Sequence, residues 1–478
     1  MTDRKPNVLF ILTDEWRAQS TGYGGDQDAP TPRIDDLARE STSFENAISG
    51  APVCCPARAS LLTGQYPLEH GVYINDVELE PNGTTLGEVY RDAGYRTGYI
   101  GKWHLYGSPD GFYGRRRDPI PKEKRFGFDF WRAAECTHDY NSSIYFRDDE
   151  VEPRVWEGYD ADAQTDAASE FILGADDRPY FLVVSYGPPH FPLHTAPERF
   201  RKEYANSPVA LRGNVPDELR DMTVEAMRGY YAHIAALDEC VARLLEAVEM
   251  SGAADDTIVV FTSDHGDMMG SQGIRPDVKT CPWDESVRVP LLIRYPRVLE
   301  AGKVDTPVNT PDLMPTLLGL SGLDVPETVS GSDVLDSPGT SSYLNMAVPI
   351  LWARTYGLGE YRGVRTRRHT YVRSLAGPWL LYDNVEDPLQ QVNLVGDPAS
   401  RSVLDELEAE LQRWMTDLDD EFRPAEDHLR RDGLEHFREV NGPIGRSQGP
   451  NGSWTSTMEP TPGVLLDPLT ASYAGIAP

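Results

Sequence analysis

Continuous apolar runs alternate with predicted helices over the first two thirds of the chain. A run without polar positions is typical of a strand that is buried on both faces, as in a parallel sheet. Segments that we expect to be buried strands of this kind, most of them largely apolar, occupy residues 7–13, 96–100, 180–186, 257–263 and 289–294. Apolar spacing and capping residues predict helices between them, at residues 32–39, 84–93, 161–173 and 216–250. This order predicts an α/β fold with a large, mostly parallel sheet flanked by helices.

The pattern changes beyond about residue 330. Shorter apolar segments joined by tight turns predict a small antiparallel sheet, with strands at residues 347–353, 363–367, 369–374 and 379–382. We expect an amphipathic helix at residues 402–418 to pack on this sheet. Beyond Phe422 the chain is polar and rich in Gly and Pro, which predicts an extended tail along the surface. We therefore divide the chain into a large α/β domain (1–330), a subdomain (331–422) and a tail (423–478).

Two of the predicted strands end in acidic residues. The run at 7–13 leads into Asp14 and Glu15, and the run at 257–263 leads into Asp264 and His265. The carboxyl ends of parallel strands meet at one edge of a sheet, where such folds bind ligands. Three carboxylates and an imidazole brought together there would suit a hard cation. The alternative for Asp14 is that it only caps the turn that follows.

A pair of cysteines precedes a short apolar helix. The segment Cys54-Cys55-Pro56-Ala57-Arg58 leads into apolar residues that end at Gly64. Because proline suits the first turn of a helix, we expect Cys54 just before the helix N-terminus, where an anion is favoured, with Arg58 one turn further on. Cys54 is then either a nucleophilic thiol of low pKa or half of a buried pair of small apolar side chains. These residues alone leave both interpretations open.

Composition excludes several classes of partner. The formal net charge is −31, and no extended basic patch is visible, so nucleic acid is not an expected partner. The five cysteines are scattered and odd in number, which argues against a disulfide framework. The apolar run at residues 8–12 is too short for a signal segment or a membrane span. We therefore expect a cytoplasmic protein without a membrane partner, and its oligomeric state stays open.

The segment from Cys54 to Gly64, Cys-x-Pro-x-Arg followed by Ala-Ser-Leu-Leu-Thr-Gly, resembles the signature of the type I sulfatases of the alkaline phosphatase superfamily. In that family a formylglycine-generating enzyme oxidises the first cysteine to formylglycine after translation. The resemblance implies that Cys54, and not Cys55, is the modified residue. Pro56 and Arg58, which the converting enzyme is expected to read, are both present, while Ala57 stands where many members carry serine.

Further segments match the same family in chain order, from about residue 7 to residue 418. The phrase YRTGYIGKWHLYG resembles the segment whose lysine bridges formylglycine and sulfate and whose histidine acts on the hydrate, which implies Lys102 and His104. The Pro-His-x-Pro motif implies that His190 lies near the leaving-group oxygen. The phrase VKTCPWDESVRVP implies Lys279 as a further catalytic residue.

The resemblance also implies a metal site. The family closes it with two acids from the first strand, Asp-Asn or Asp-His from a later strand, and an oxygen of formylglycine. Here the corresponding residues are Asp14, Glu15, Asp264, His265 and residue 54, and Glu15 stands where the family has a second aspartate. Oxygen ligands favour Ca²⁺, while His265 would also suit Mn²⁺, with Mg²⁺ as a further alternative.

The implied activity is hydrolysis of a sulfate monoester, either a sulfated carbohydrate or a small alkyl or aryl sulfate. Lys102, Lys279 and the metal would hold the sulfate oxygens, and Arg58 would support the hydrate. His190 or Lys279 would protonate the leaving oxygen. His104 would then take a proton from the remaining hydroxyl, which expels sulfate and restores the aldehyde.

The leaving group is expected to contact the loops at residues 107–159. Within them, His138, Asp139 and Asn141 offer polar side chains, although an ordinary polar loop explains the same residues. Two other functions stay open. One is a phosphonate monoester or phosphodiester hydrolase of the same superfamily, and the other is an inactive binding protein that keeps the fold.

Overall fold

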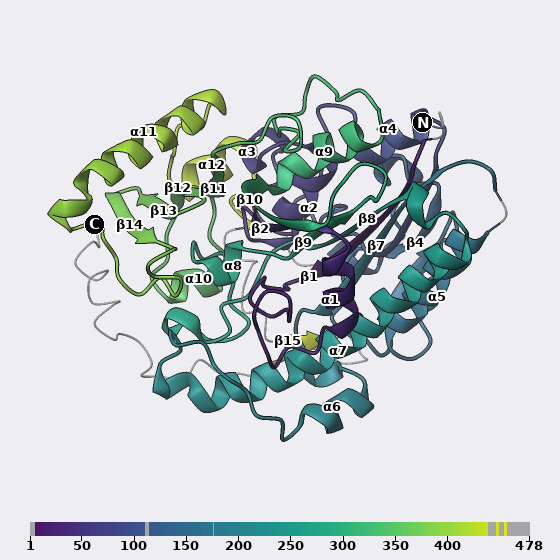
Figure 1. Cartoon of the computed structure of the whole chain (residues 1–478). Helices are drawn as coiled ribbons and strands as arrows, with labels where there is room; N and C mark the ends of the chain where they lie inside the picture. The colour runs from purple at the N-terminus through teal and green to yellow at the C-terminus, as the bar shows by residue number, and fades with distance from the viewer. Residues whose placement is uncertain (1–4, 110–113, 175, 438–445, 449–453, 457–478) are drawn as a thin grey trace.

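The computed structural model describes residues 5–109, 114–174, 176–437, 446–448 and 454–456. Within these ranges one ten-stranded sheet forms the centre of the molecule, in the order β10-β2-β9-β8-β1-β7-β3-β4-β5-β6 (Figure 1). Its strands are β1 (Asn7–Asp14), β2 (Thr42–Ile48), β3 (Arg96–Lys102), β4 (Phe130–Ala134), β5 (Ile144–Arg147), β6 (Arg154–Val155), β7 (Tyr180–Pro189), β8 (Thr257–Ser263), β9 (Leu291–Arg294) and β10 (Gly302–Asn309).

Most neighbouring strands in the sheet run parallel. The pairs β1–β7, β1–β8, β3–β7, β3–β4 and β2–β10 are parallel, whereas β9 is antiparallel to β2 and β8, and β5 is antiparallel to β4. The predicted large, mostly parallel sheet is confirmed. Because β1 lies between β8 and β7, its carboxyl end is at the centre of the sheet's edge.

Helices cover both faces of this sheet (Figure 1). One face packs against α1 (Pro32–Arg39), α5 (Asp160–Leu173) and α7 (Arg220–Met250), and the other against α2 (Cys54–Thr63), α4 (Leu86–Asp92) and α9 (Leu313–Leu320). Strand β1 shows why residues 8–12 are all apolar: Phe10 packs on the α2 side and Ile11 on the α7 side. Both faces of the strand are therefore core.

The C-terminal part forms a second, four-stranded antiparallel sheet. It consists of β11 (Ser341–Met346), β12 (Tyr361–Thr366), β13 (His369–Ser374) and β14 (Gly377–Asp383), paired in chain order. Helix α11 (Arg401–Asp417) packs on it through Leu404, Leu407 and Leu411, at one side of the molecule in Figure 1. The predicted small sheet and helix are confirmed. The division of the chain at residues 330 and 422 stays a prediction.

Several predicted details are wrong. The apolar segment 347–353 is not a strand, because β11 ends at Met346 and the short helix α10 (Leu351–Thr355) follows Pro349 and Ile350. Helix α2 begins at Cys54 itself, with Val53 as its N-cap, so Pro56 is the third helical residue rather than the first. Proline is tolerated there because the N–H groups of the first turn have no intrahelical partner.

The chain after Phe422 is not extended throughout. Helix α12 (Ala425–Asp432) packs into the core through Ala425 and Leu429, and the Tyr73 hydroxyl donates a hydrogen bond to Asp432 at 2.7 Å. Short strands follow at β15 (Arg446–Gln448) and β16 (Trp454–Ser456), which pair with each other. The remainder of the predicted tail lies outside the described residues.

The remaining helices are short, at α3 (Pro67–His70), α6 (Glu198–Tyr204) and α8 (Asp284–Val287), and a 3₁₀ turn spans Gly114–Arg117. Among the helices described, none combines the length and apolar character needed to cross a bilayer. All five cysteines are free thiols.

Candidate active site

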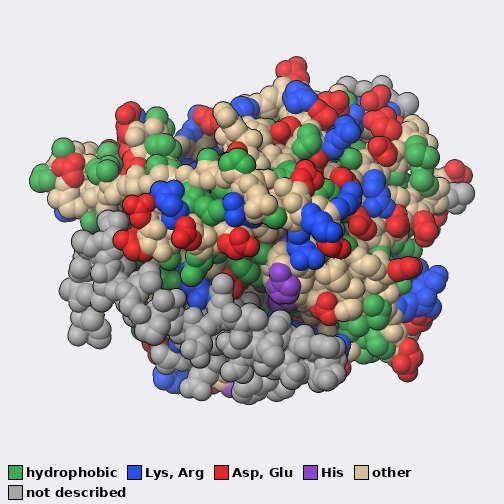
Figure 2. Space-filling view, turned by 90° about the horizontal axis from the view of Figure 1, so that it is seen from below, with side chains coloured by type: hydrophobic (Ala, Val, Ile, Leu, Met, Phe, Trp, Pro, Cys, Tyr) green, Lys and Arg blue, Asp and Glu red, His purple; other side chains and the backbone are tan. Residues whose placement is uncertain are grey.

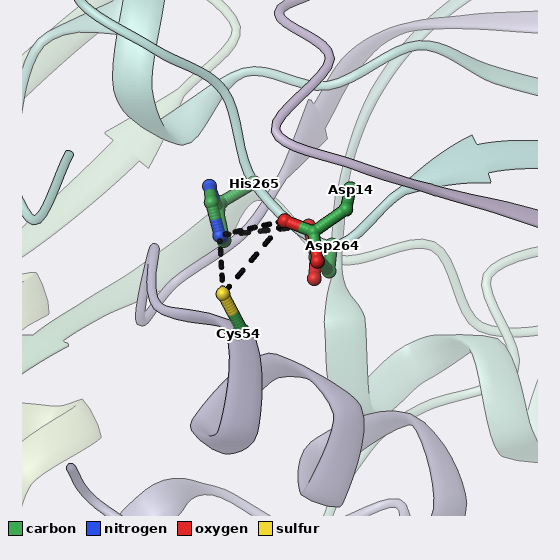
Figure 3. Close-up of side chains that lie close together, drawn as sticks. All are labelled: Asp14, Cys54, Asp264 and His265. Carbon is green, nitrogen blue, oxygen red and sulfur yellow. Dashed lines mark hydrogen bonds and ion pairs between the residues drawn. The ribbon is translucent and has the colours of Figure 1, made fainter. Parts of the chain in front are cut away.

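The N-terminus of α2 meets the carboxyl ends of β1 and β8 (Figure 3). The Sγ atom of Cys54 lies 3.7 Å from Oδ1 of Asp14 and 3.2 Å from Nε2 of His265. The same Nε2 lies 3.6 Å from Oδ1 of Asp264. All four residues are buried. The two acidic strand ends therefore do converge beside residue 54, as the parallel order predicts.

These four side chains fit a divalent cation. One ligand atom from each of Asp14, Cys54, Asp264 and His265 lies within 4.8 Å of every other. Since metal–ligand bonds of hard cations measure about 2.0–2.6 Å, atoms this close can share one coordination shell. A sulfur, an imidazole and two carboxylates can each act as a metal ligand, so the donor set suits the implied metal.

Glu15 faces a different group of residues. Its backbone adopts a left-handed conformation with φ 67°, which turns the side chain toward Lys279 and His190. Its Oε1 lies 3.3 Å from Nζ of Lys279, and its Oε2 lies 3.1 Å from Nε2 of His190. Together with Asp14 and His190 it forms a second group of potential ligands. Direct ligation by Glu15 therefore stays a prediction.

Arg58 holds the two aspartates in place. Its guanidinium lies 3.2 Å from Oδ2 of Asp14 and 3.0 Å from Oδ2 of Asp264, and it is completely surrounded by protein. A third nitrogen donates to Oγ of Ser185 at 2.7 Å and to the carbonyl of Lys102 at 3.1 Å. Removing one partner of such a buried ion pair costs about 3–5 kcal/mol, because it leaves an uncompensated buried charge.

The remaining predicted catalytic residues also surround Cys54. The Nζ atom of Lys102 donates to Asp14, and Nζ of Lys279 lies 3.6 Å from Sγ of Cys54 and 2.8 Å from Nε2 of His190. His104 lies close enough to Cys54 for each side chain to shift the pKa of the other, although neither imidazole nitrogen makes a hydrogen bond in the described structure. The structure thus brings all six predicted catalytic side chains to one buried centre.

Opposing effects determine the charge at this centre. Burial raises the pKa of the Cys54 thiol, but Lys102, Lys279 and His265 together lower it well below its usual range. Burial and the nearby Lys279 lower the pKa of His190 to about 4, whereas Cys54 and Glu15 outweigh burial and raise the pKa of Lys279. At neutral pH a charged lysine therefore faces a neutral imidazole.

The three predicted leaving-group residues differ in position. The ring of His138 stacks on the ring of His190, with 4.6 Å between the centroids. Asp139 instead accepts a hydrogen bond from Ser142, and the Asn141 amide donates to the carbonyl of Thr195 at 2.9 Å. Only His138 lies against a predicted catalytic residue, and the roles of all three stay predictions.

Sequence reasoning missed three polar residues that support the site. Ser185 interrupts the apolar run of β7 and accepts from Arg58. Asp267 accepts from the backbone N–H groups of Met269 at 2.6 Å and Asp277 at 2.9 Å, which anchors the segment that precedes Lys279. Asp76 lies beside His104. A polar residue within a buried run is a usable signal for Ser185, but no pattern in the sequence identifies the other two.

The chain is similar to known proteins over most of its length. The family described as sulfatase matches residues 6–323, and the family described as N-sulphoglucosamine sulphohydrolase, C-terminal, matches residues 278–417. The ulvan-active sulfatase of Formosa agariphila is 40% identical over 439 residues, which cover 89% of this chain and 84% of that protein. The endo-4-O-sulfatase of Bacteroides thetaiotaomicron is 28% identical over 475 residues, covering 87% and 92%. A solved yidJ sulfatase structure from Bacteroides fragilis has a TM-score of 0.78 at 30% identity, covering 88% and 98%.

Proposed function

The chain belongs to the sulfatase family and is a sulfuric ester hydrolase, and we propose that it removes sulfate from a sulfated carbohydrate, with formylglycine at position 54 as its nucleophile. The observation that carries this proposal is the burial of Cys54 among two lysines, three histidines and two aspartates. A carbohydrate substrate is supported by the C-terminal match to a family named for N-sulphoglucosamine and by the ulvan-active relative.

Cys54 is the residue that the converting enzyme would modify. It carries the Cys-x-Pro-x-Arg motif, and its Sγ marks where an oxygen of the modified side chain would stand, 3.2 Å from His265 and 3.6 Å from Lys279. Formylglycine supplies an aldehyde hydrate with two hydroxyls, of which one attacks sulfur and the other allows the sulfate to be released later. A thiol offers no second hydroxyl for that release.

Asp14, Asp264, His265 and residue 54 would hold the divalent metal, with Ca²⁺ as the proposed ion because oxygen donors predominate once residue 54 is oxidised. A bound cation would neutralise negative charge on the sulfate and lower the pKa of the attacking hydroxyl. Arg58 orients both carboxylates and favours their ionised forms, since it pairs with each of them.

The lysines and histidines stabilise charge and transfer protons in the two halves of the reaction. Lys102 and Lys279 bring positive charge to the sulfate oxygens. As the bond between sulfur and the alcohol oxygen breaks, its electron pair goes to that oxygen, and Lys279, the charged member of its pair with His190, supplies the proton. His104 then accepts the proton of the remaining hydroxyl while sulfate leaves. Over the cycle one water is consumed, and an alcohol and sulfate are formed.

The leaving sugar would lie on the His190 side of the site. His138 stacks on His190 there and is half-buried, so it has one ring face for a catalytic residue and an edge for a ligand. Asp139 and Asn141 would shape the same loop through their bonds to Ser142 and Thr195.

A panel of sulfated mono- and disaccharides, assayed for released sulfate with the purified, converted protein, tests this function. We expect turnover of at least one sugar sulfate, loss of turnover in Cys54→Ala, and unchanged turnover in Cys240→Ala. Cys240 is a matched control, because it is equally buried but lies on α7 and contacts Asp162. Turnover of an aryl phosphonate monoester but of no sulfate ester would contradict the proposal.

Removal of the metal is a second test of the proposed function. Chelation should abolish sugar sulfate turnover, and added Ca²⁺ should restore it together with one equivalent of bound ion per chain. Asp264→Asn should bind less metal even before any substrate is added, because a carboxylate ligand is lost. Full metal binding in that variant would remove Asp264 from the proposed ligands.

A further inference from the structure

A buried aspartate that has no role in the proposed chemistry lies next to His104. The Oδ1 atom of Asp76 is 3.5 Å from Nε2 of His104, and neither side chain is more than 2% exposed. Cys54 raises the pKa of His104, so the imidazole lies close to the nucleophile as well as to the carboxylate, although neither of its nitrogens makes a hydrogen bond in the described structure. In the order carboxylate, imidazole, nucleophile, this is the arrangement by which a carboxylate orients a catalytic histidine.

Asp76 is itself fixed from several directions. Arg116 makes three contacts of 3.2–3.3 Å with its carboxylate. The backbone N–H of Asp76 donates to Sγ of Cys55 at 3.3 Å, and its carbonyl accepts from the N–H of Ser108 at 2.7 Å. Cys55 therefore helps to hold Asp76 in its position beside His104. Cys55 itself lies too deep to act on substrate.

Both partners adopt an uncommon backbone conformation. Asp76 has φ 64° and His104 has φ 59°, which is the left-handed region that non-glycine residues rarely occupy. Such conformations persist only where the surrounding structure enforces them, and they concentrate at functional sites. Two such conformations, at residues whose side chains face each other, indicate that the local fold maintains the relative orientation of Asp76 and His104.

We propose that Asp76 is a positioning residue for the second half of the reaction, when His104 accepts a proton and sulfate leaves. This inference rests on the proposed function. In that half the remaining hydroxyl of residue 54 gives its proton to His104, the bond from its carbon to the sulfated oxygen breaks, and the electron pair leaves with sulfate as the carbonyl re-forms. A carboxylate beside the imidazole holds the ring in place and stabilises the positive charge it acquires.

The first half depends on other residues. Lys279 and His190 serve the alcohol leaving group, and Asp76 contacts neither of them in the described structure. Loss of the Asp76 carboxylate should therefore slow sulfate release while the alcohol is still expelled at its normal rate.

Rapid-mixing kinetics of Asp76→Asn with 4-nitrophenyl sulfate tests this inference. We expect a burst of one 4-nitrophenol per active site, followed by a steady state in which kcat is lowered on the order of 10²-fold. Because kcat/KM reports only steps up to the first irreversible one, it should stay within about threefold of wild type, and KM should fall together with kcat. His104→Ala should show the same burst.

Two further variants separate positioning from folding. Arg116→Gln leaves the aspartate but removes its main ion pair, and it should show the same burst with a smaller loss of kcat. Asp238→Asn is the matched control, because Asp238 is a buried aspartate on α7 that accepts from the N–H groups of Arg33 and Ile34 at the start of α1 and makes no contact with His104 in the described structure. Its kcat should not change.

A parallel fall of kcat and kcat/KM in Asp76→Asn, without a burst, would overturn the inference and assign Asp76 a structural role only. Unchanged kinetics in both Asp76→Asn and Arg116→Gln would overturn it as well. Wild-type turnover, measured beside the variants, tests the proposed function. A failure of the proposed function is therefore distinguishable from a failure of the inference about Asp76.

Discussion

Position 54 combines burial with an excess of nearby positive charge. The thiol is 2% exposed, yet Lys102, Lys279 and His265 hold its pKa below the usual range. The same cations would attract the oxygens of a sulfate ester, which is the charge distribution that stabilises the transition state of sulfuryl transfer. An anion in this position is thus favoured in spite of an acidic molecule around it.

Lys279 gives the sharpest prediction for a single residue. Lys279→Met should lower kcat for a sugar sulfate by 10²- to 10⁴-fold, roughly the contribution of a general acid, and lower it much less for 4-nitrophenyl sulfate, whose leaving oxygen needs no proton. Steady-state assays with both esters measure the difference. Lys303→Met, at an exposed lysine paired with Glu45, is the control and should leave both rates unchanged. Equal losses for the two esters would exclude Lys279 as the acid.

Residue identities were more predictable than residue orientations. The motifs around Cys54, Lys102, His190 and Lys279 identified side chains that the fold does bring together. The direction of Glu15 was not predictable, because it depends on a positive φ and on residues more than 170 positions away. The contact of Asp76 with His104 was not predictable for the same reason, since it exists only in the folded chain.

Among the secondary elements, uniform apolar runs predicted the central strands well. Strands β1, β7 and β8 match the predicted runs, because a strand buried on both faces is apolar over most of its length. Strands β2 and β10 were missed, since TSFENAI and GKVDTPVN mix polar and apolar residues toward the edge of the sheet. Segment 347–353 was assigned wrongly because it is apolar without being paired.

Helix α3 makes a pH-dependent contact with α2. The backbone N–H of Val72 donates to Nδ1 of His70 at 3.1 Å, and Nε2 of His70 lies 3.0 Å from Oγ of Ser60. Burial lowers the pKa of His70 to about 3, so the imidazole stays neutral in the folded protein. Protonation of Nδ1 would break the bond from Val72.

His70 should therefore make the protein less stable in mild acid. The unfolded chain binds a proton as the pH falls below about 6.5, while folded His70 does so only near its depressed pKa, so folding loses about 1.4 kcal/mol per pH unit in between. Relative to His70→Gln, the wild type should lose about 2 kcal/mol of unfolding free energy between pH 7 and pH 5. Urea titrations at both pH values measure this. A difference that does not change with pH would contradict the assignment.

The net negative charge of the whole molecule produces an electrostatic field that repels its proposed anionic substrate. Its formal net charge is −31, and on the face drawn in Figure 2 acidic and basic side chains are interspersed rather than separated into one large basic patch. A polyanionic saccharide is repelled until it reaches the buried lysines. Sequence composition predicted this net charge directly, and the motifs predicted which cations would gather around residue 54, whereas the burial of that cationic centre is visible only in the folded chain.

Salt should therefore assist, and not weaken, the capture of a large substrate. Raising NaCl from about 0.05 to about 0.5 M shortens the Debye length from roughly 14 Å to roughly 4 Å. We expect kcat/KM for a sulfated oligosaccharide to rise by up to about tenfold over this range, because like-charge repulsion is screened. For singly charged 4-nitrophenyl sulfate it should change much less. A fall of kcat/KM with salt for the oligosaccharide would instead indicate a cationic surface that steers it.

The central claim is that oxidation of Cys54, in its buried site between β1, β8 and α2, creates the nucleophile. Mass spectrometry of the peptide around Cys54, on preparations made with different amounts of the converting enzyme, gives the converted fraction directly. The account predicts that sulfatase turnover per chain rises in proportion to this fraction and extrapolates to zero in unconverted protein. Full turnover in protein whose Cys54 is still a thiol would contradict it.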